Sequence, residues 1–213
     1  MRRTAGCFGP GGLPIPHEQC HTQPIGESCI KWTLPLGYES FDAFVEDLLA
    51  ERAVRPLFIV AAAKVDSLLL DILRAYLFPQ IANSKSPDEL LDGDAPLSTF
   101  SARIKMSRRL GLIDETLYLA LERLRHLRNL CAHSISFNAS ASPAREHLSE
   151  LRVKIETRDS YTLTKKTYFQ SATEHPIEQH QCLVVTVCVL LESIRAKIDR
   201  TTGNKSAMKI AAK

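Results

Sequence analysis

Apolar side chains recur at intervals of three and four residues through most of the chain, which is the spacing of amphipathic α-helices. The first such stretch follows Ser40, whose hydroxyl suits a helix N-cap. Its apolar positions are Phe41, Phe44, Val45, Leu48 and Leu49. Continued along the chain, the pattern predicts an all-α protein built as a bundle of about five to seven helices.

The stretch between Pro56 and Pro79 predicts the central helix of this bundle. Proline is tolerated in the first turn of a helix and ends a helix that it follows. Apolar residues spread around most of the circumference, so we expect this helix to contact more helices than any other. They are Leu57, Phe58, Val60, Ala61, Val65, Leu68, Leu69, Ile72, Leu73 and Tyr76.

Three charged residues interrupt this apolar helix: Lys64, Asp66 and Asp71. Charges are costly to bury unless they are paired. We therefore expect a structural ion pair with Arg103 or Arg128 from a neighbouring helix. The alternative is that one of the carboxylates orients an active-site arginine.

Capping residues predict where the next helices begin and end. A short helix begins at Ser86 and ends near Gly93, and another runs from Ser98 to Gly111. Asp114 caps the helix that follows. The apolar side chains that this helix turns inward are Leu117, Leu121, Leu124 and Cys131.

The stretch from 146 to 172 has a less regular pattern. Val153, Ile155 and Thr157 alternate with polar residues, so a short hairpin over 153–165 is an alternative to helix there. A final helix is expected from about Pro176 to Asp199.

Domain organisation follows from composition along the chain. Glycines and prolines interrupt residues 1–36, which predicts a disordered N-terminal tail. Residues 37–200 form a single helical domain, and 201–213 form a frayed basic C-terminal tail. At 213 residues with 45% hydrophobic composition, the chain is long enough to bury one sizeable core.

Charge and hydropathy exclude several classes of protein. The net charge of +3 and the pI of about 8.5 fall short of a dedicated nucleic-acid binder. No apolar run reaches the roughly 18 residues of a membrane span, so no membrane association is expected. The N-terminus lacks the apolar region of a secretory signal, which predicts a cytoplasmic protein.

The cysteines predict neither a disulfide framework nor a metal site. Cys131, Cys182 and Cys188 fall inside predicted helices, where a reduced cysteine packs as a small apolar residue. Cys7, Cys20 and Cys29 lie in the N-terminal tail with His17 and His21, and zinc binding there is the alternative. The paired short spacings of zinc sites are missing, so we expect no metal and no cofactor.

The helix after Asp114 carries the most informative polar residues. Arg125, Asn129 and His133 follow each other at four-residue intervals and form one stripe, whereas Arg128 and His133 lie about 140° apart. A guanidinium, a carboxamide and an imidazole together suit a phosphate or another anion. The alternative is that they satisfy carbonyls at the end of the helix.

The preceding helix has a basic face formed by Arg103, Lys105, Arg108 and Arg109. With Arg125 they are candidates for contacts to a phosphate or a nucleic-acid backbone, and the alternative is a solvated basic face. A helix-turn-helix that reads DNA is disfavoured, because the second helix opens with Asp114 and Glu115.

Five stretches resemble the mannitol operon repressor (MltR) family, and the order Arg128-Asn129…His133 resembles the signature of the HEPN superfamily of helical domains. The five stretches are 37–44, 55–66, 97–105, 110–114 and 125–134. The first resemblance implies a repressor-type transcriptional regulator that acts through protein contacts or weak nucleic-acid binding. The second implies a HEPN-like bundle and a metal-independent endoribonuclease of a toxin or defence system.

In the nuclease, Arg128 would stabilise charge on the phosphate, Asn129 would position it, and His133 would be the general acid or base. HEPN sites usually form across a dimer, so this resemblance implies a homodimer. A protein partner, either a regulator or an antitoxin, and RNA or DNA complete the expected partners.

Overall fold

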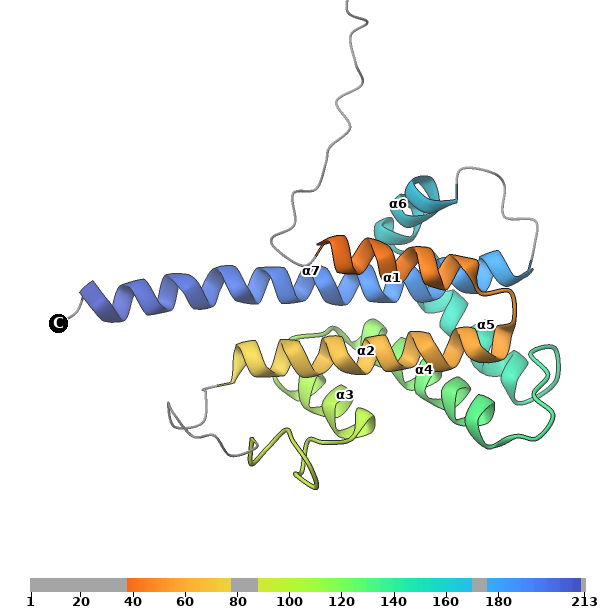
Figure 1. Cartoon of the computed structure of the whole chain (residues 1–213), viewed down its shortest axis with the longest axis horizontal. Coiled ribbons are helices and arrows are strands. Elements are labelled where there is room, and N and C mark those ends of the chain that lie inside the picture. Colours follow the sequence, from red (N-terminus) through yellow and green to blue (C-terminus); the bar gives the residue numbers. More distant parts are fainter. Residues whose placement is uncertain (1–37, 78–87, 170–175, 212–213) are drawn as a thin grey trace, which may run out of the picture. The chain divides into compact units, whose positions relative to one another are not determined.

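The computed structural model describes residues 38–77, 88–169 and 176–211, with side chains described for 41–77, 88–169 and 176–198. This part of the chain contains seven helices and no strand, which confirms the all-α bundle (Figure 1). The helices are α1 (Tyr38–Ala50), α2 (Val54–Tyr76), α3 (Phe100–Arg109), α4 (Glu115–His133), α5 (Ala144–Glu156), α6 (Asp159–Tyr168) and α7 (Pro176–Ala211). The predicted tail of 1–36 and its cysteines lie outside the described residues.

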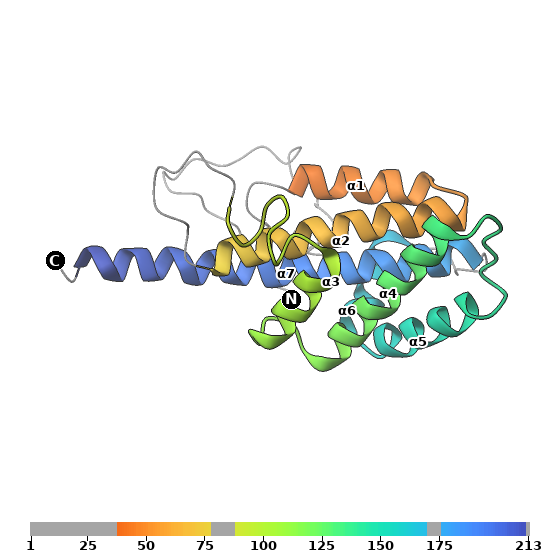
Figure 2. The same ribbon diagram turned by 90° about the horizontal axis from the view of Figure 1, so that it is seen from below.

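Helices α2 and α7 pack side by side along the middle of the helical unit (Figures 1 and 2). In the described part, α2 packs against α1, α3, α4 and α7, whereas α7 packs against α1, α2, α5 and α6. The prediction that α2 contacts more helices than any other is therefore wrong, because α7 contacts as many helices as α2 does. The predicted apolar positions of α2 are buried, except Val60 and Tyr76, which are 47% and 46% exposed.

A short turn places α3 and α4 against each other. The Thr99 hydroxyl caps α3 by accepting from the amide of Ala102 at 3.2 Å, one residue after the predicted start. Gly111 follows α3 with φ +70°, a conformation that glycine adopts without strain. Asp114 then caps α4 as predicted, with its Oδ1 accepting from the amide of Leu117 at 2.7 Å.

The hairpin predicted as an alternative over 153–165 is wrong, because α5 and α6 occupy this stretch. The alternation was incidental: Ile155 is buried, but Val153 is 64% exposed. The residues that α5 buries against the core are Ala144, Leu148, Leu151 and Ile155, which follow helical spacing.

The short helix predicted to end near Gly93 is also wrong, since residues 88–99 form turns. Here Asp88 satisfies the backbone locally, because its Oδ1 accepts from the amides of Leu90 and Leu91 at 2.8 and 3.0 Å. Such side-chain bonds compete with a continuing helix.

The outermost helix boundaries also differ from those predicted. Helix α1 begins at Tyr38, before the expected cap at Ser40, and α7 continues past Asp199 to Ala211. The end of α1 is held by the buried Gln181 of α7, whose Nε2 donates to the carbonyls of Leu48, Leu49 and Glu51 at 3.1, 3.0 and 2.9 Å. Within the described ranges, no helix is long and apolar enough to cross a membrane.

Candidate functional site

Three of the candidate residues on α4 line one pocket. We call this the α4 pocket, and it has a volume of about 450 Å³. Its lining residues come from α2, α3, α4 and the turn before α3: Ile59, Ala62, Ala63, Asp66, Thr99, Phe100, Ser101, Arg125, Arg128 and Asn129. The pocket therefore combines an apolar wall with guanidinium, carboxamide and hydroxyl groups.

The two arginines of the α4 pocket differ in how their charges are compensated. Nη2 of Arg125 lies 2.8 Å from Oε2 of Glu122, one turn earlier on α4. Nη1 of the exposed Arg128 donates to Oδ1 of Asn129 at 3.1 Å, and Arg128 forms no ion pair with a described residue. Arg128 is thus the guanidinium that remains available to an anionic ligand.

His133 is exposed on the last turn of α4 and does not line the α4 pocket. His133 lies on the same stripe of α4 as Arg125 and Asn129 but about 6 Å further along the helix axis, beyond the lining residues of the pocket. The helix end is also held in place, because Nε of Arg55 donates to the carbonyl of Cys131 at 2.7 Å. One copy of the chain therefore gathers Arg128 and Asn129 but not His133.

Arg103 is not available to a phosphate, because it is turned inward and only 8% exposed. Its Nη1 lies 2.8 Å from Oδ1 of Asp66, which confirms the expected structural ion pair. Its Nε and Nη2 donate to the carbonyls of Leu97 at 3.0 Å and Leu91 at 3.4 Å. Arg103 thereby fixes α3 and the preceding turns to α2, and we remove it from the candidate binding residues.

The other two charges of α2 have different surroundings. Nζ of Lys64 lies 5.2 Å from the centre of the Phe44 ring, a cation–π contact. Asp71 is exposed. Neither of them contributes to the α4 pocket.

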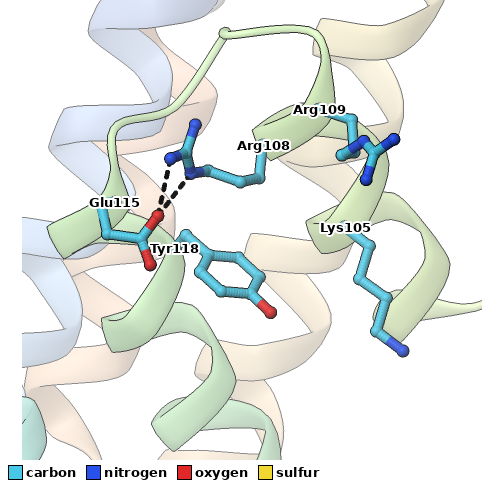
Figure 3. A pocket seen from close by; sticks show the side chains of 5 residues that line it. All are labelled: Lys105, Arg108, Arg109, Glu115 and Tyr118. Carbon is cyan, nitrogen blue, oxygen red and sulfur yellow. Dashed lines mark hydrogen bonds and ion pairs between the residues drawn. The ribbon is translucent and has the colours of Figure 1, made fainter.

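The remaining basic residues of α3 line a second pocket, the basic pocket, of about 490 Å³. Its lining residues are Lys105, Arg108, Arg109, Glu115 and Tyr118 (Figure 3). Nε and Nη2 of Arg108 both lie 2.7 Å from Oε2 of Glu115, whereas the exposed Lys105 and Arg109 form no ion pair with a described residue. Sequence reasoning missed Tyr118, although it precedes Arg125 by seven residues on the same side of α4.

A stacked pair of imidazoles joins α4 to α5 on a neighbouring surface. The ring centres of His126 and His147 lie 5.1 Å apart with planes at 17°. Burial, and then the charge of Arg125, lower the pKa of His126. No sequence pattern indicated this pair, because its members lie on different helices.

The three described cysteines, Cys131, Cys182 and Cys188, are buried. Burial raises the pKa of the Cys131 and Cys182 thiols to about 11, so both remain protonated apolar residues at neutral pH. Within the described ranges, no group of three or more His, Cys, Asp or Glu side chains could hold a metal ion.

Two solved structures share this fold. A crystal structure of a possible transcriptional regulator, YggD from Shigella flexneri, matches with a TM-score of 0.50 and 15% identity, over 74% of this chain and 98% of its own. A chain from the X-ray structure of the MtlR–HPr complex of Escherichia coli matches with a TM-score of 0.50 and 22% identity, over 75% and 98%. No family model matches the chain, and no curated protein does.

At such identities the similarity concerns the fold alone. The expected all-α helical bundle is confirmed, and its fold is similar to those of the two solved structures. Membership of that family stays a prediction, as do the HEPN assignment, the homodimer and RNA binding.

Proposed function

We propose that this chain is a regulator-type protein, as the resemblance to the mannitol operon repressor family implies, and that it acts by binding a protein partner at the α4 pocket. The observation that carries the proposal is the chemistry of this pocket. The partly exposed Ile59 and the aromatic Phe100 line the pocket together with the exposed Arg128, which forms no ion pair with a described residue. Arginine and aromatic side chains are enriched at protein interfaces, where an apolar centre is bordered by polar groups.

The solved structures are in keeping with this proposal. One neighbour in fold is described as a possible transcriptional regulator, and the other was solved in complex with a second protein, HPr. Acting through protein contacts also needs no enclosed catalytic centre, and His133 lies outside the pocket that holds Arg128 and Asn129.

The test is to remove the chain from its host and restore it as wild type, as Arg128→Glu, or as the control Arg145→Glu. Arg145 is an exposed arginine at the start of α5 and has no described ion pair. A regulator changes the rate at which particular transcripts are synthesised and leaves RNA half-lives unaltered. Wild type and Arg145→Glu should restore synthesis, whereas Arg128→Glu should not. Altered half-lives with unaltered synthesis would refute the proposal.

The second candidate function is a metal-independent endoribonuclease, favoured by the shared placement of Arg128 and Asn129 in the α4 pocket. Here a homodimer would supply His133 from the second copy as the general acid or base. Purified protein should cleave total RNA in EDTA, and His133→Ala should lose this activity while its melting temperature stays the same, because an exposed helix-end side chain packs little. Absence of cleavage by the wild-type dimer would exclude this function.

A further inference from the structure

The α4 pocket and the basic pocket follow one another along the same side of the packed α3–α4 pair. Ser101 lines the first pocket and Lys105 the second, four residues apart on α3. Arg125 lines the first and Tyr118 the second, seven residues apart on α4. Intervals of four and seven residues return to the same side of an α-helix. The two pockets therefore belong to one elongated surface, which we call the α3–α4 face.

Positive charge exceeds negative charge along this face. Its five cations are Lys105, Arg108, Arg109, Arg125 and Arg128. Glu115 and Glu122 compensate one arginine each, and Asp66 is paired with the buried Arg103. Lys105, Arg109 and Arg128 form no ion pair in the described part of the chain, and they are spread over both pockets of the face.

The cations do not converge on a point. In Figure 3 the side chain of Arg108 extends to Glu115, whereas those of Arg109 and Lys105 lie on the other side of the pocket, and the Tyr118 ring lies between Glu115 and Lys105. A single phosphate is bound by donors that meet around it. Separated cations beside an aromatic ring instead suit several carboxylates carried along a chain, with the ring and the aliphatic parts of lysine and arginine in apolar contact.

We infer that the α3–α4 face binds an acidic segment of the protein partner, rich in Asp and Glu, which extends from the basic pocket to the α4 pocket. This inference rests on the proposed function. A protein segment is favoured over a nucleic acid because the net charge of the chain, +3, falls short of that of a dedicated nucleic-acid binder. Complementary charge across an interface mainly sets specificity and the association rate.

Fluorescence anisotropy of the full chain with fluorescein-labelled octaglutamate at low salt tests the inference. Wild type should bind the peptide, and binding should weaken as salt is added. Lys105→Glu/Arg109→Glu and Arg128→Glu should each weaken binding about ten-fold or more, because an attraction becomes a repulsion. The control Arg145→Glu/Lys166→Glu reverses two exposed cations on α5 and α6 and should bind as wild type does.

Circular dichroism of every variant must show the wild-type melting temperature, so that lost binding is not lost folding. No binding of octaglutamate by wild type, or equal loss in the control, would overturn the inference. The inference would also be overturned if labelled octauridine bound wild type more tightly than the peptide does and the same variants lost this binding. If only Arg128→Glu weakened binding of the peptide, the proposal that the segment extends to the basic pocket would be overturned. The proposed function is tested separately, because transcript synthesis does not depend on the chemistry of the partner.

Discussion

The ion pair between Arg103 and Asp66 provides the sharpest test of how this fold is held together. Replacing Arg103, a residue that is 8% exposed, with methionine keeps much of the side-chain volume but removes the guanidinium. Two well-formed hydrogen bonds are lost, at 2.8 Å to Oδ1 of Asp66 and at 3.0 Å to the carbonyl of Leu97. The third, at 3.4 Å to Leu91, is too long to add much.

The magnitude follows from these contacts. Hydrogen bonds that involve a charged group contribute about 1.5–3 kcal/mol each, and breaking one side of a buried pair costs about 3–5 kcal/mol. The side chain of Asp66 is 30% exposed, so water recovers part of its solvation. We therefore expect Arg103→Met to lower the free energy of unfolding by about 3 kcal/mol. For a domain of this size, that lowers the melting temperature by about 6–12 °C.

Urea denaturation followed by circular dichroism measures the loss, with Asp66→Leu and the double variant completing a mutant cycle. The double variant should be more stable than Arg103→Met, because removing Asp66 removes the carboxylate left without a partner. Additive losses, or a loss below about 1 kcal/mol for Arg103→Met, would show that the pair does not hold α3 to α2.

Three further predictions concern other buried groups. Leu69→Ala should lower the free energy of unfolding by about 2–5 kcal/mol, because this side chain is fully buried on α2; a urea midpoint unchanged from wild type would contradict that. Gln181→Leu should cost about 2–3 kcal/mol in the same assay, since three carbonyls at the end of α1 lose their donor, and a neutral effect would mean that water replaces it. Burial lowers the pKa of His180 in the folded chain to about 4, whereas the usual value for histidine is 6.5. As the pH falls below about 6.5, the unfolded chain therefore binds a proton that the folded chain does not, and folding loses stability. Wild type should therefore lose up to about 3 kcal/mol between pH 7 and 4 that His180→Gln keeps, and parallel stability curves would show that His180 titrates normally.

Local patterns in the sequence were sufficient for most of the helices. Asp114 as the cap of one helix and Gly111 as the end of the helix before it were both correct, because each depends only on the residues beside it. The hairpin alternative was wrong because it rested on alternation at only three positions. The buried residues Leu148, Leu151 and Ile155 follow the spacing of a helix. On α2, spacing alone did not show that Val60 faces solvent.

The candidate site was less predictable because its geometry depends on contacts between helices. Arg103 has the same charge as Lys105, yet only the approach of Asp66 from α2 decides that Arg103 is buried. The placement of Arg128 and Asn129 in one pocket follows from their adjacency on α4, but the wall supplied by Ile59 and Phe100 required the packed fold. Tyr118 likewise became a candidate only in the packed fold, where it lines a pocket with residues of α3.

The bonds from Arg55 to the end of α4 bear on kinetics as well as on geometry. Its Nε donates to the carbonyl of Cys131 at 2.7 Å, and its Nη1 makes a longer contact of 3.4 Å with the carbonyl of Ile135. Unwinding the last turn of α4 to bring His133 towards Arg128 would therefore break the shorter bond. In the nuclease proposed as the second candidate function, a second copy would therefore supply His133. Activity per molecule would rise with protein concentration below the dissociation constant of the dimer and level off above it, whereas binding of a partner by one copy would show no such dependence.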